Sequence, residues 1–205
     1  MSSWLVKLVS RPRPTLHVYD KQRRYALLVI DMLNDFVTGS LKTDRAKPII
    51  PKIAGLLDAF RSRGLPVIYS NDSHEPQDFE LHRWPYHAMK GSEGGHVIPE
   101  LSPKKRELIS EKSTYSAFYT TKLDDLLHSL YDLKGANTLI LTGLHTDICI
   151  RHTTADAFFR GYEVIVPEDA VNSFTAEQHR QGLEYLKSNY IIGVMPTKNV
   201  IKKLH

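Results

Sequence analysis

Short apolar runs alternate along the chain with longer segments in which apolar positions recur at helical spacing. The apolar runs are rich in β-branched residues and predict strands at 25–31, 65–72, 106–111, 137–143, 162–171 and 190–196. The segments with helical spacing predict helices at 49–64, 120–135, 149–161 and 175–189. This alternation predicts the α/β class, with three α/β/α layers doubly wound around a mostly parallel six-stranded sheet.

The chain length and the placement of these elements predict one domain. A chain of 205 residues suits one domain with a sizeable core, and no linker divides residues 25–205. Residues 1–24 precede the first strand and are expected to form an N-terminal arm packed on the domain. Arginines and prolines at 11–14 interrupt the apolar part of this arm too early for a signal peptide. Residues 71–105 lack a sustained period, and a loop of this length is typical of a functional segment.

The composition excludes several functional classes. Hydrophobic residues make up 41% of the chain and charged residues 24%, as in a globular protein. The net charge of +4 comes from scattered basic residues without an aromatic-interleaved patch, so we expect no nucleic-acid partner. No apolar run approaches the length of a membrane span. The single cysteine cannot form an internal disulfide, which favours a reducing, cytoplasmic setting. Association into a homo-oligomer is compatible with this composition.

Two common nucleotide-binding signatures are missing from the sequence. The segment after the first predicted strand reads DMLNDFVTG, where a dinucleotide-binding domain would carry G-x-G-x-x-G. The P-loop pattern G-x-x-x-x-G-K-[ST] does not occur either. The predicted sheet is therefore not expected to bind a dinucleotide or a nucleoside triphosphate.

Chemically capable side chains follow four of the predicted strands at their carboxyl ends. Asp31 ends the first strand, Asp72 and His74 follow the second, Lys112 follows the third, and Cys149 comes after the fourth. In an open parallel sheet these ends face one crevice, which is where ligands bind. Each residue alone is typical of ordinary core or surface positions, but their convergence predicts a catalytic site.

Cys149 is predicted to be the nucleophile of this site. It lies in the first turn of a helix that Thr146 or Asp147 can cap, and a helix N-terminus lowers a thiol pKa. A nearby Lys112 ammonium would also lower the thiol pKa. Asp31 could accept the thiol proton and return it to a leaving amine, while backbone N–H groups hold a developing oxyanion. The alternative is that Cys149 only fills the core.

A second cluster of polar residues predicts a metal site beside the thiol. Asp72 and His74 are alternate residues of an extended segment and therefore share a face. The following loop can add Glu80, His82 or His87. Carboxylate and imidazole ligands with open positions suit Zn²⁺, or less specifically Fe²⁺ and Mn²⁺. Asp72, His74 and His87 together favour a divalent metal over histidines that only form hydrogen bonds.

Four segments together resemble a known family. They read VIDMLNDF, NDSHEPQDFELHRWPYHAMKGSEGG, EKSTYSAF and TGLHTDICIRHTTADAFFRGYEVIVPEDAV. In order, spacing and context they are similar to the isochorismatase-like cysteine hydrolases and, within these, to the nicotinamidases. The resemblance covers about residues 25–196.

This resemblance implies roles for individual residues. It implies a catalytic triad of Asp31, Lys112 and Cys149. It implies metal ligands at Asp72, His74 and His87, with Glu80 as a fourth ligand and His82 as the competing choice. It places substrate-binding side chains at Phe36, Leu41, Trp84 and Tyr115, although ordinary packing would also explain them, Leu41 first. It further implies a cis peptide bond between Leu144 and His145, with oxyanion donors from the backbone N–H groups of His145 and Cys149.

The function implied by the resemblance is metal-dependent hydrolysis of nicotinamide to nicotinate and ammonia, through a thioester on Cys149, as a part of NAD salvage. A related amidase acting on an N-carbamoyl, ureido or other small amide is the main alternative. Isochorismatase activity is disfavoured because that branch typically lacks the cysteine. A metal-binding or regulatory module without catalysis is a further alternative. His145 stands where the family commonly has a smaller residue, which leaves the amide substrate open.

Overall fold

The computed structural model of the protein describes residues 20–204, so most of the predicted arm lies outside the described residues. The strands are β1 (Tyr25–Ile30), β2 (Val67–Asp72), β3 (Leu108–Lys112), β4 (Thr138–Leu144), β5 (Glu163–Pro167), β6 (Val171–Asn172) and β7 (Gly193–Met195). The α-helices are α1 (Asn34–Val37), α2 (Ile50–Ser62), α3 (Leu123–Ser129), α4 (Cys149–Phe159), α5 (Ala176–Tyr190) and α6 (Thr197–Ile201). Short 3-10 helices lie at Asp44–Ile49, Phe79–His82, Glu93–Gly95 and Pro99–Leu101.

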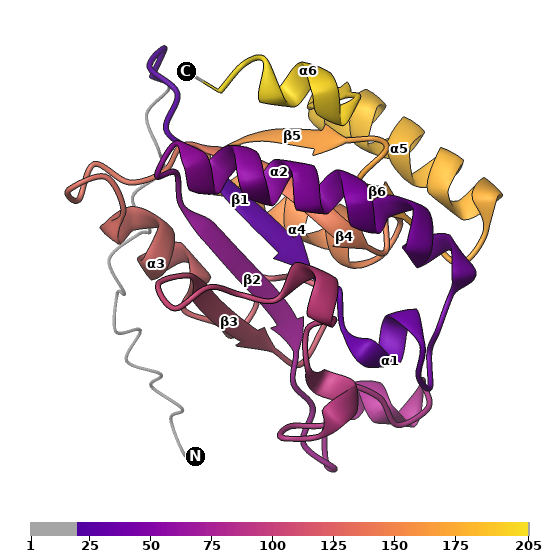
Figure 1. The fold of residues 1–205 in the computed structure, drawn as a ribbon. Coiled ribbons are helices and arrows are strands. Elements are labelled where there is room, and N and C mark those ends of the chain that lie inside the picture. The colour runs from indigo at the N-terminus through magenta and orange to yellow at the C-terminus, as the bar shows by residue number, and fades with distance from the viewer. Residues whose placement is uncertain (1–19, 205) are drawn as a thin grey trace, which may run out of the picture.

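The strands form one parallel sheet in the order β3-β2-β1-β4-β5-β7, with β6 paired to the end of β4. From β1 the chain winds outward through β2 to β3, and the later strands fill the other side of β1 (Figure 1). The direction of winding therefore reverses between β1 and β4, and such a switch point opens a crevice at the carboxyl ends of the strands. The predicted doubly wound α/β fold is confirmed.

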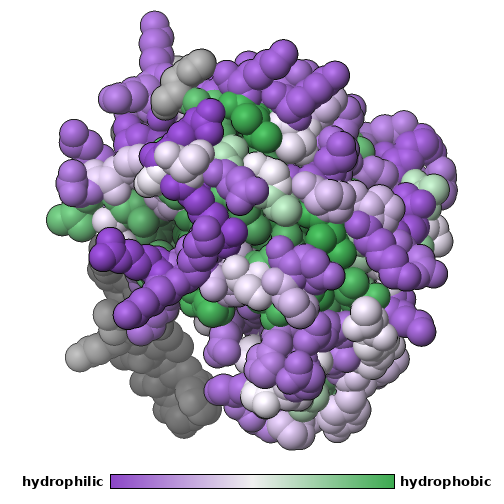
Figure 2. Space-filling model, viewed as in Figure 1, coloured by the Kyte–Doolittle hydropathy of each residue, from purple (hydrophilic) through white to green (hydrophobic). Residues whose placement is uncertain are grey.

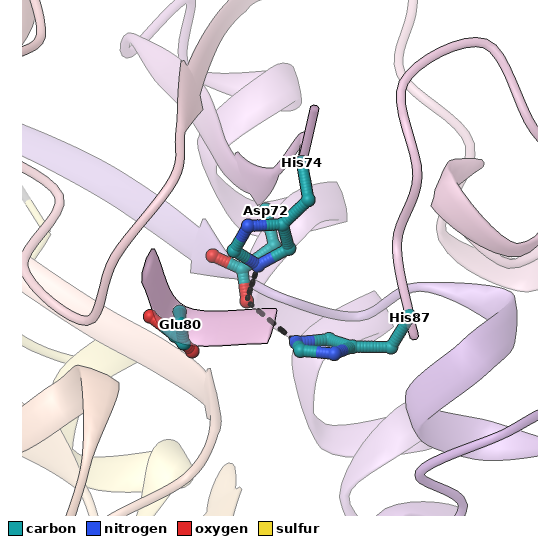
Figure 3. Close-up of side chains that lie close together, drawn as sticks. All are labelled: Asp72, His74, Glu80 and His87. Carbon is teal, nitrogen blue, oxygen red and sulfur yellow. Dashed lines mark ion pairs between the residues drawn. The ribbon is translucent and has the colours of Figure 1, made fainter. Parts of the chain in front are cut away.

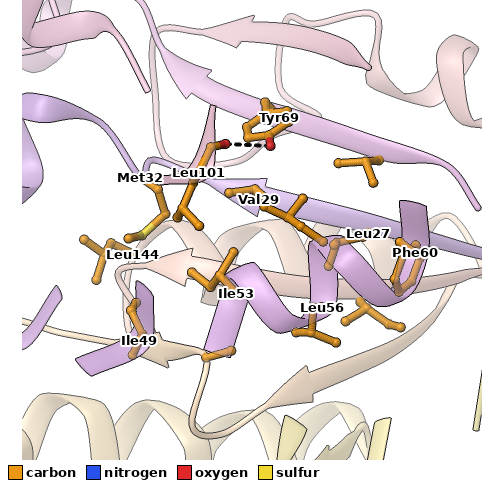
Figure 4. Packing of buried hydrophobic residues seen from close by; sticks show 14 of the residues in the cluster. Leu27, Val29, Met32, Ile49, Ile53, Leu56, Phe60, Tyr69, Leu101 and Leu144 are labelled. Carbon is orange, nitrogen blue, oxygen red and sulfur yellow. Dashed lines mark hydrogen bonds between the residues drawn. The ribbon is translucent and has the colours of Figure 1, made fainter. Parts of the chain in front are cut away.

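Strand β1 is the centre of the core because it is buried on both faces. Alternate side chains of a strand point to opposite faces of the sheet. Leu27 and Val29 belong to the cluster that packs against α2 and α6, which Figure 4 shows in close-up. Leu28 and Ile30 belong to the second cluster, formed with α3, α4 and α5. The sheet is thus covered by helices on both sides, which completes the three layers.

Two predicted elements differ from the structure in extent. The segment predicted as one strand at 162–171 forms two strands, β5 and β6. β5 pairs with the start of β4, and after a turn that follows Pro167, β6 pairs with Gly143 and Leu144 at the end of β4. The sheet therefore has seven strands where the pattern predicted six. The helix predicted at 120–135 covers only Leu123–Ser129, because residues 131–133 take positive φ angles that an α-helix cannot continue through.

No helix within residues 20–204 has both the length and the apolar character needed to cross a membrane. On the face drawn in Figure 2, hydrophilic residues predominate and hydrophobic ones lie in small groups between them. This distribution agrees with a core that is enclosed between the helix layers.

The end of β4 lies unusually close to the end of β1. Gly143 pairs with Ile30 and has a φ of +105°, and a Cβ at this position would come within 1.9 Å of the Ile30 carbonyl oxygen. Only glycine adopts such a conformation without strain and leaves room for the neighbouring backbone. The next residue after Ile30 is Asp31, so this contact also sets where that carboxylate emerges from the sheet.

We expect Gly143→Ala to lower the free energy of unfolding by about 2 kcal/mol or more, because the added methyl group meets backbone that has no room to move. The matched control is Gly55→Ala in α2, where a Cβ meets nothing within 4 Å. That control should be neutral or stabilising by up to about 1 kcal/mol, since alanine favours helices. Urea unfolding followed by circular dichroism measures both. Equal stability of the two variants would contradict the proposed close approach.

Candidate active site

The polar residues predicted from the strand ends meet at the switch point of the sheet. Asp31 directly follows β1, Asp72 is the last residue of β2, and Lys112 is the last residue of β3. Cys149 is the first residue of α4, which follows β4 after a short turn. All four side chains are buried, so this edge of the sheet holds a cluster of ionisable groups shielded from water.

Lys112 joins the other three side chains. Its Nζ donates a hydrogen bond of 2.8 Å to Asp31 Oδ2 and a second one to the Asp72 carboxylate, and it lies 3.8 Å from Cys149 Sγ. The backbone N–H of Asp72 donates to the other oxygen of Asp31 at 2.9 Å. The structure therefore brings Asp31, Lys112 and Cys149 into contact, as the sequence predicted.

The electrostatics of this cluster differ from the prediction made for the thiol. Burial raises the pKa of Cys149 well above its usual value, and Asp31 and Asp72 raise it further, although Lys112 opposes them. Burial and the Asp72 charge also raise the pKa of Asp31, to about 6. Burial alone would lower the Lys112 pKa, but the adjacent carboxylates outweigh it and hold that pKa well above normal. The resting cysteine is thus a thiol, and the expected lowering of its pKa was wrong.

The predicted capping of α4 was also wrong. The N-cap position is Ile148, and no side chain caps the helix there. The Thr146 hydroxyl pairs with His179 at 2.9 Å, and the Asp147 carboxylate accepts a hydrogen bond from Ser173 at 2.6 Å. Both side chains thus hold the turn before α4 against later parts of the chain.

This turn leaves two backbone donors free beside the cysteine. The peptide bond between Leu144 and His145 is cis, as the resemblance implied. Within residues 20–204, the backbone N–H groups of His145 and Cys149 donate no hydrogen bond, whereas Thr146 and Ile148 do. Paired N–H groups next to a nucleophile are suited to hold the oxyanion of a tetrahedral intermediate.

The metal-ligand cluster predicted from the loop also assembles. Asp72, His74, Glu80 and His87 each offer a ligand atom, and these atoms all lie within 4.8 Å of one another (Figure 3). Asp72 Oδ2 lies 3.9 Å from Nε2 of each histidine. Two imidazoles and two carboxylates form a donor set that suits zinc and related divalent metals.

The surroundings of the two histidines fit a cation at this position. Nδ1 of His74 lies 3.2 Å from the Asp78 carboxylate, and Nδ1 of His87 lies 2.7 Å from the Pro85 carbonyl oxygen. These acceptors hold the proton on Nδ1, so the lone pair of each Nε2 is directed into the cluster. Nε2 of His74 is buried and has no hydrogen-bond partner within the described chain.

The charges of the cluster also favour a bound cation. Asp31, Asp72 and Glu80 supply three carboxylates against the one ammonium of Lys112. Burial and the nearby Asp72 charge raise the pKa of Glu80 to about 8, so an ionised Glu80 is costly unless a cation is close by. A divalent metal would balance this excess of negative charge. His82, the alternative fourth ligand, is exposed and packs against Phe79, so it lies outside the cluster.

A small cavity opens above the thiol and the metal-ligand cluster. Its walls include the four predicted substrate-binding residues, Phe36, Leu41, Trp84 and Tyr115. Cys149, Asp72, Glu80 and His87 also line it. The thiol, three of the metal-ligand residues and the aromatic side chains therefore line one pocket.

Two further wall residues, Ile148 and Phe174, did not emerge from the sequence. The Phe174 ring stacks with His145, at 3.9 Å between ring centroids, and with Trp84, at 6.0 Å. Phe174 lies in the loop that follows β6, where no periodic pattern marks it. Only the fold brings this loop over the switch point.

Comparisons with known proteins agree with this geometry. The family model of the isochorismatase domain matches residues 25–198. The structure of N-carbamoylsarcosine amidase from Thermoplasma acidophilum is similar at 40% sequence identity and a TM-score of 0.78, covering 85% of this chain and 96% of the other.

Two further solved structures are nicotinamidases or pyrazinamidases. The nicotinamidase/pyrazinamidase PncA from Bacillus subtilis is 33% identical with a TM-score of 0.78, covering 84% of this chain and 99% of that one. The pyrazinamidase of Pyrococcus horikoshii, solved in complex with zinc, is 27% identical with a TM-score of 0.76 and covers 84% and 99% of the two chains. With a matching family model over most of its length, the protein belongs to the isochorismatase family of hydrolases.

Proposed function

We propose that the protein is a cysteine amidohydrolase that cleaves a small primary amide into an acid and ammonia. The observation that carries this proposal is the contact of Lys112 with both Asp31 and Cys149, where Cys149 lines a small cavity. A buried carboxylate, ammonium and thiol in contact are the groups that nucleophilic amide cleavage requires. Mere core packing of Cys149 would not explain the two buried charges beside it.

The first half of the reaction forms a thioester. Asp31 accepts the proton of the Cys149 thiol, and the sulfur attacks the amide carbon, forming a C–S bond. The backbone N–H groups of His145 and Cys149 stabilise the negative oxygen of the tetrahedral intermediate. The protonated Asp31 then gives its proton to the amine, and ammonia leaves as the C–N bond breaks.

The second half of the reaction releases the acid. A water molecule gives a proton to Asp31 and attacks the thioester carbon. The C–S bond breaks, the acid leaves, and the sulfur recovers its proton from Asp31. Lys112 keeps its charge throughout and stabilises the anionic forms of Asp31 and Cys149. The raised pKa of Cys149 is compatible with this sequence, because Asp31, with a pKa of about 6, can take the proton as the sulfur attacks.

Asp72, His74, Glu80 and His87 would hold a divalent metal at the cavity wall, and the zinc complex of the Pyrococcus horikoshii pyrazinamidase supports zinc as the candidate. When bound, this metal would supply a positive charge that orients a substrate nitrogen or oxygen. The protein side chains contribute the remaining wall, in which the aromatic rings of Phe36, Trp84 and Tyr115 would contact the substrate.

Nicotinamide is the first candidate substrate. Aromatic side chains line the cavity and would pack against a pyridine ring, and the similar structure from Bacillus subtilis is a nicotinamidase. On this assignment the product is nicotinate, and the reaction would serve NAD salvage. An N-carbamoyl or ureido amide is the second candidate, supported by the similar N-carbamoylsarcosine amidase.

Cys149→Ala is expected to abolish ammonia release from nicotinamide and from N-carbamoyl amides, because no other cysteine is present to form the thioester. The fold should persist, since the change removes one sulfur from a packed site. A coupled ammonia assay and a thermal unfolding curve measure the two effects. Ammonia release at the wild-type rate by a folded Cys149→Ala protein would remove the thiol from the mechanism.

His87→Ala is expected to weaken zinc binding by at least about tenfold, because it removes one ligand from the four-residue cluster. His82→Ala is the matched control, since His82 is a nearby exposed histidine outside the cluster. Zinc content after dialysis, measured by atomic absorption, and a competition titration with a chelating dye give the affinities. Unchanged zinc binding in His87→Ala would show that the ligand set is wrong.

A further inference from the structure

The Asp35 carboxylate connects the segment after β1 to the loop that carries the metal ligands. Asp35 lies in α1, and its Oδ2 accepts a hydrogen bond of 2.8 Å from the backbone N–H of Ala88. Its Oδ1 accepts a second one from the N–H of Ser40 at 3.1 Å. The Ser40 contact is local and closes the turn after α1, but Ala88 lies 53 residues further along the chain. A role in the local turn therefore explains only one of the two contacts.

The backbone of Ala88 is joined to both histidines of the metal-ligand cluster. His87 and His74 reach the cluster from different stretches of chain (Figure 3). The N–H of Ala88 belongs to its peptide bond with His87, and its carbonyl oxygen accepts a hydrogen bond of 3.0 Å from the N–H of His74. The carbonyl oxygen of His74 in turn accepts from the N–H of Lys90 at 2.9 Å. Asp35 therefore holds the one residue whose backbone connects the two ligands.

Ala88 has a conformation that its surroundings must maintain. It is fully buried and has a φ of +44°, which residues other than glycine rarely adopt. Such a conformation persists only where neighbouring groups fix it, and the Asp35 carboxylate is one of these groups. Without Asp35, the buried N–H of Ala88 would lose its acceptor, which is costly enough to favour a shift of the loop.

The position of the carboxylate is closely defined by two glycines. A Cβ at Gly94 would lie 2.1 Å from Asp35 Oδ2, and a Cβ at Gly39 would lie 2.2 Å from Oδ1. Neither glycine has a positive φ angle, so a special backbone conformation does not account for them. The space that the carboxylate occupies does. Gly94 lies in the same loop as Ala88, so this loop is shaped to receive Asp35.

The residues beside Asp35 contact the same loop. The backbone N–H of Asn34 donates to the carbonyl oxygen of His96 at 2.9 Å. The Phe36 ring meets the His87 ring edge-on, at 5.5 Å between centroids. The segment that begins with the catalytic carboxylate of Asp31 therefore also sets where the metal-ligand loop lies.

Resting on the metal site of the proposed function, we propose that Asp35 is a positioning residue that holds the backbone of Ala88 and thereby aligns His74 and His87 for a divalent metal. Asp35 itself is not a ligand, because it lies outside the four-residue cluster. Groups that orient metal ligands from behind change metal affinity by about 10- to 100-fold when they are removed.

The first test measures zinc affinity in Asp35 variants by competition with a chelating dye. Asp35→Ala removes both acceptor oxygens and is expected to weaken zinc binding by at least about tenfold. Asp35→Asn keeps one acceptor oxygen and should recover part of this loss. Asp44→Ala is the matched control, because Asp44 is exposed and pairs with Lys47, and its zinc affinity should equal that of the wild type.

Gly94→Ala perturbs the same contact without changing Asp35. Its methyl group would collide with the carboxylate, so we expect zinc binding to weaken by about tenfold. In the Asp35→Ala background the methyl group meets no carboxylate, and the same change should have little further effect. This non-additivity is expected of one shared contact and not of two separate losses of stability. Gly55→Ala is the control, since a Cβ there meets nothing within 4 Å.

Cobalt-substituted protein gives a second readout that a loss of stability alone would not change. The visible absorption of bound Co²⁺ depends on the arrangement of its ligands. We expect the bands of Asp35→Ala and Gly94→Ala, measured at saturating cobalt, to differ from those of the wild type, whereas Asp44→Ala keeps the wild-type spectrum.

Wild-type zinc affinity and an unaltered cobalt spectrum in folded Asp35→Ala would overturn the role of Asp35. If Asp35→Ala does not fold, the same result in Gly94→Ala would overturn it. Additive effects of Asp35→Ala and Gly94→Ala on zinc affinity would also contradict it. A wild type that binds no zinc would instead refute the metal site of the proposed function, and the role of Asp35 with it.

Discussion

The structure depends on one buried ammonium placed between two buried carboxylates. Lys112 donates hydrogen bonds to Asp31 and Asp72, and all three side chains are shielded from water. An unpaired charge in this position would be strongly destabilising, so each of the three groups requires the others. Asp31 also lies against Cys149, and Asp72 lies against His74 and His87. The Lys112 ammonium therefore links the thiol to the metal-ligand cluster. The two halves of the candidate site are therefore one electrostatic unit.

The fold supplies this unit through the order of its strands. The carboxyl ends of β1, β2, β3 and β4 lie at one edge of the sheet, and the reversal of winding between β1 and β4 opens the crevice there. Gly143 allows β4 to approach the end of β1, and the turn that follows leads directly to the free N–H groups and to Cys149. The segment between β2 and β3, which forms no regular strand, returns over the edge to bring Glu80 and His87 to Asp72.

Much of this arrangement could be predicted from the sequence because strand ends are local features. Asp31, Lys112 and Cys149 each follow an apolar run, and parallel strands bring such positions together whatever the details of packing. The state of the thiol was predicted wrongly, since its pKa reflects burial that only the assembled layers produce. The capping of α4 failed for a similar reason, because Thr146 and Asp147 pair with residues far along the chain. Phe174, which lines the cavity, has no local pattern at all.

The central claim is that the buried thiol becomes an acyl carrier during amide hydrolysis. The most direct measurement adds hydroxylamine to the metal-loaded wild type together with whichever tested amide releases ammonia fastest. A thioester would be intercepted, so the account predicts that hydroxamate forms at the expense of the free acid while ammonia release is not slowed. Acid formation that is unaffected by hydroxylamine, with no hydroxamate and no acyl group on Cys149 after acid quenching, would contradict it.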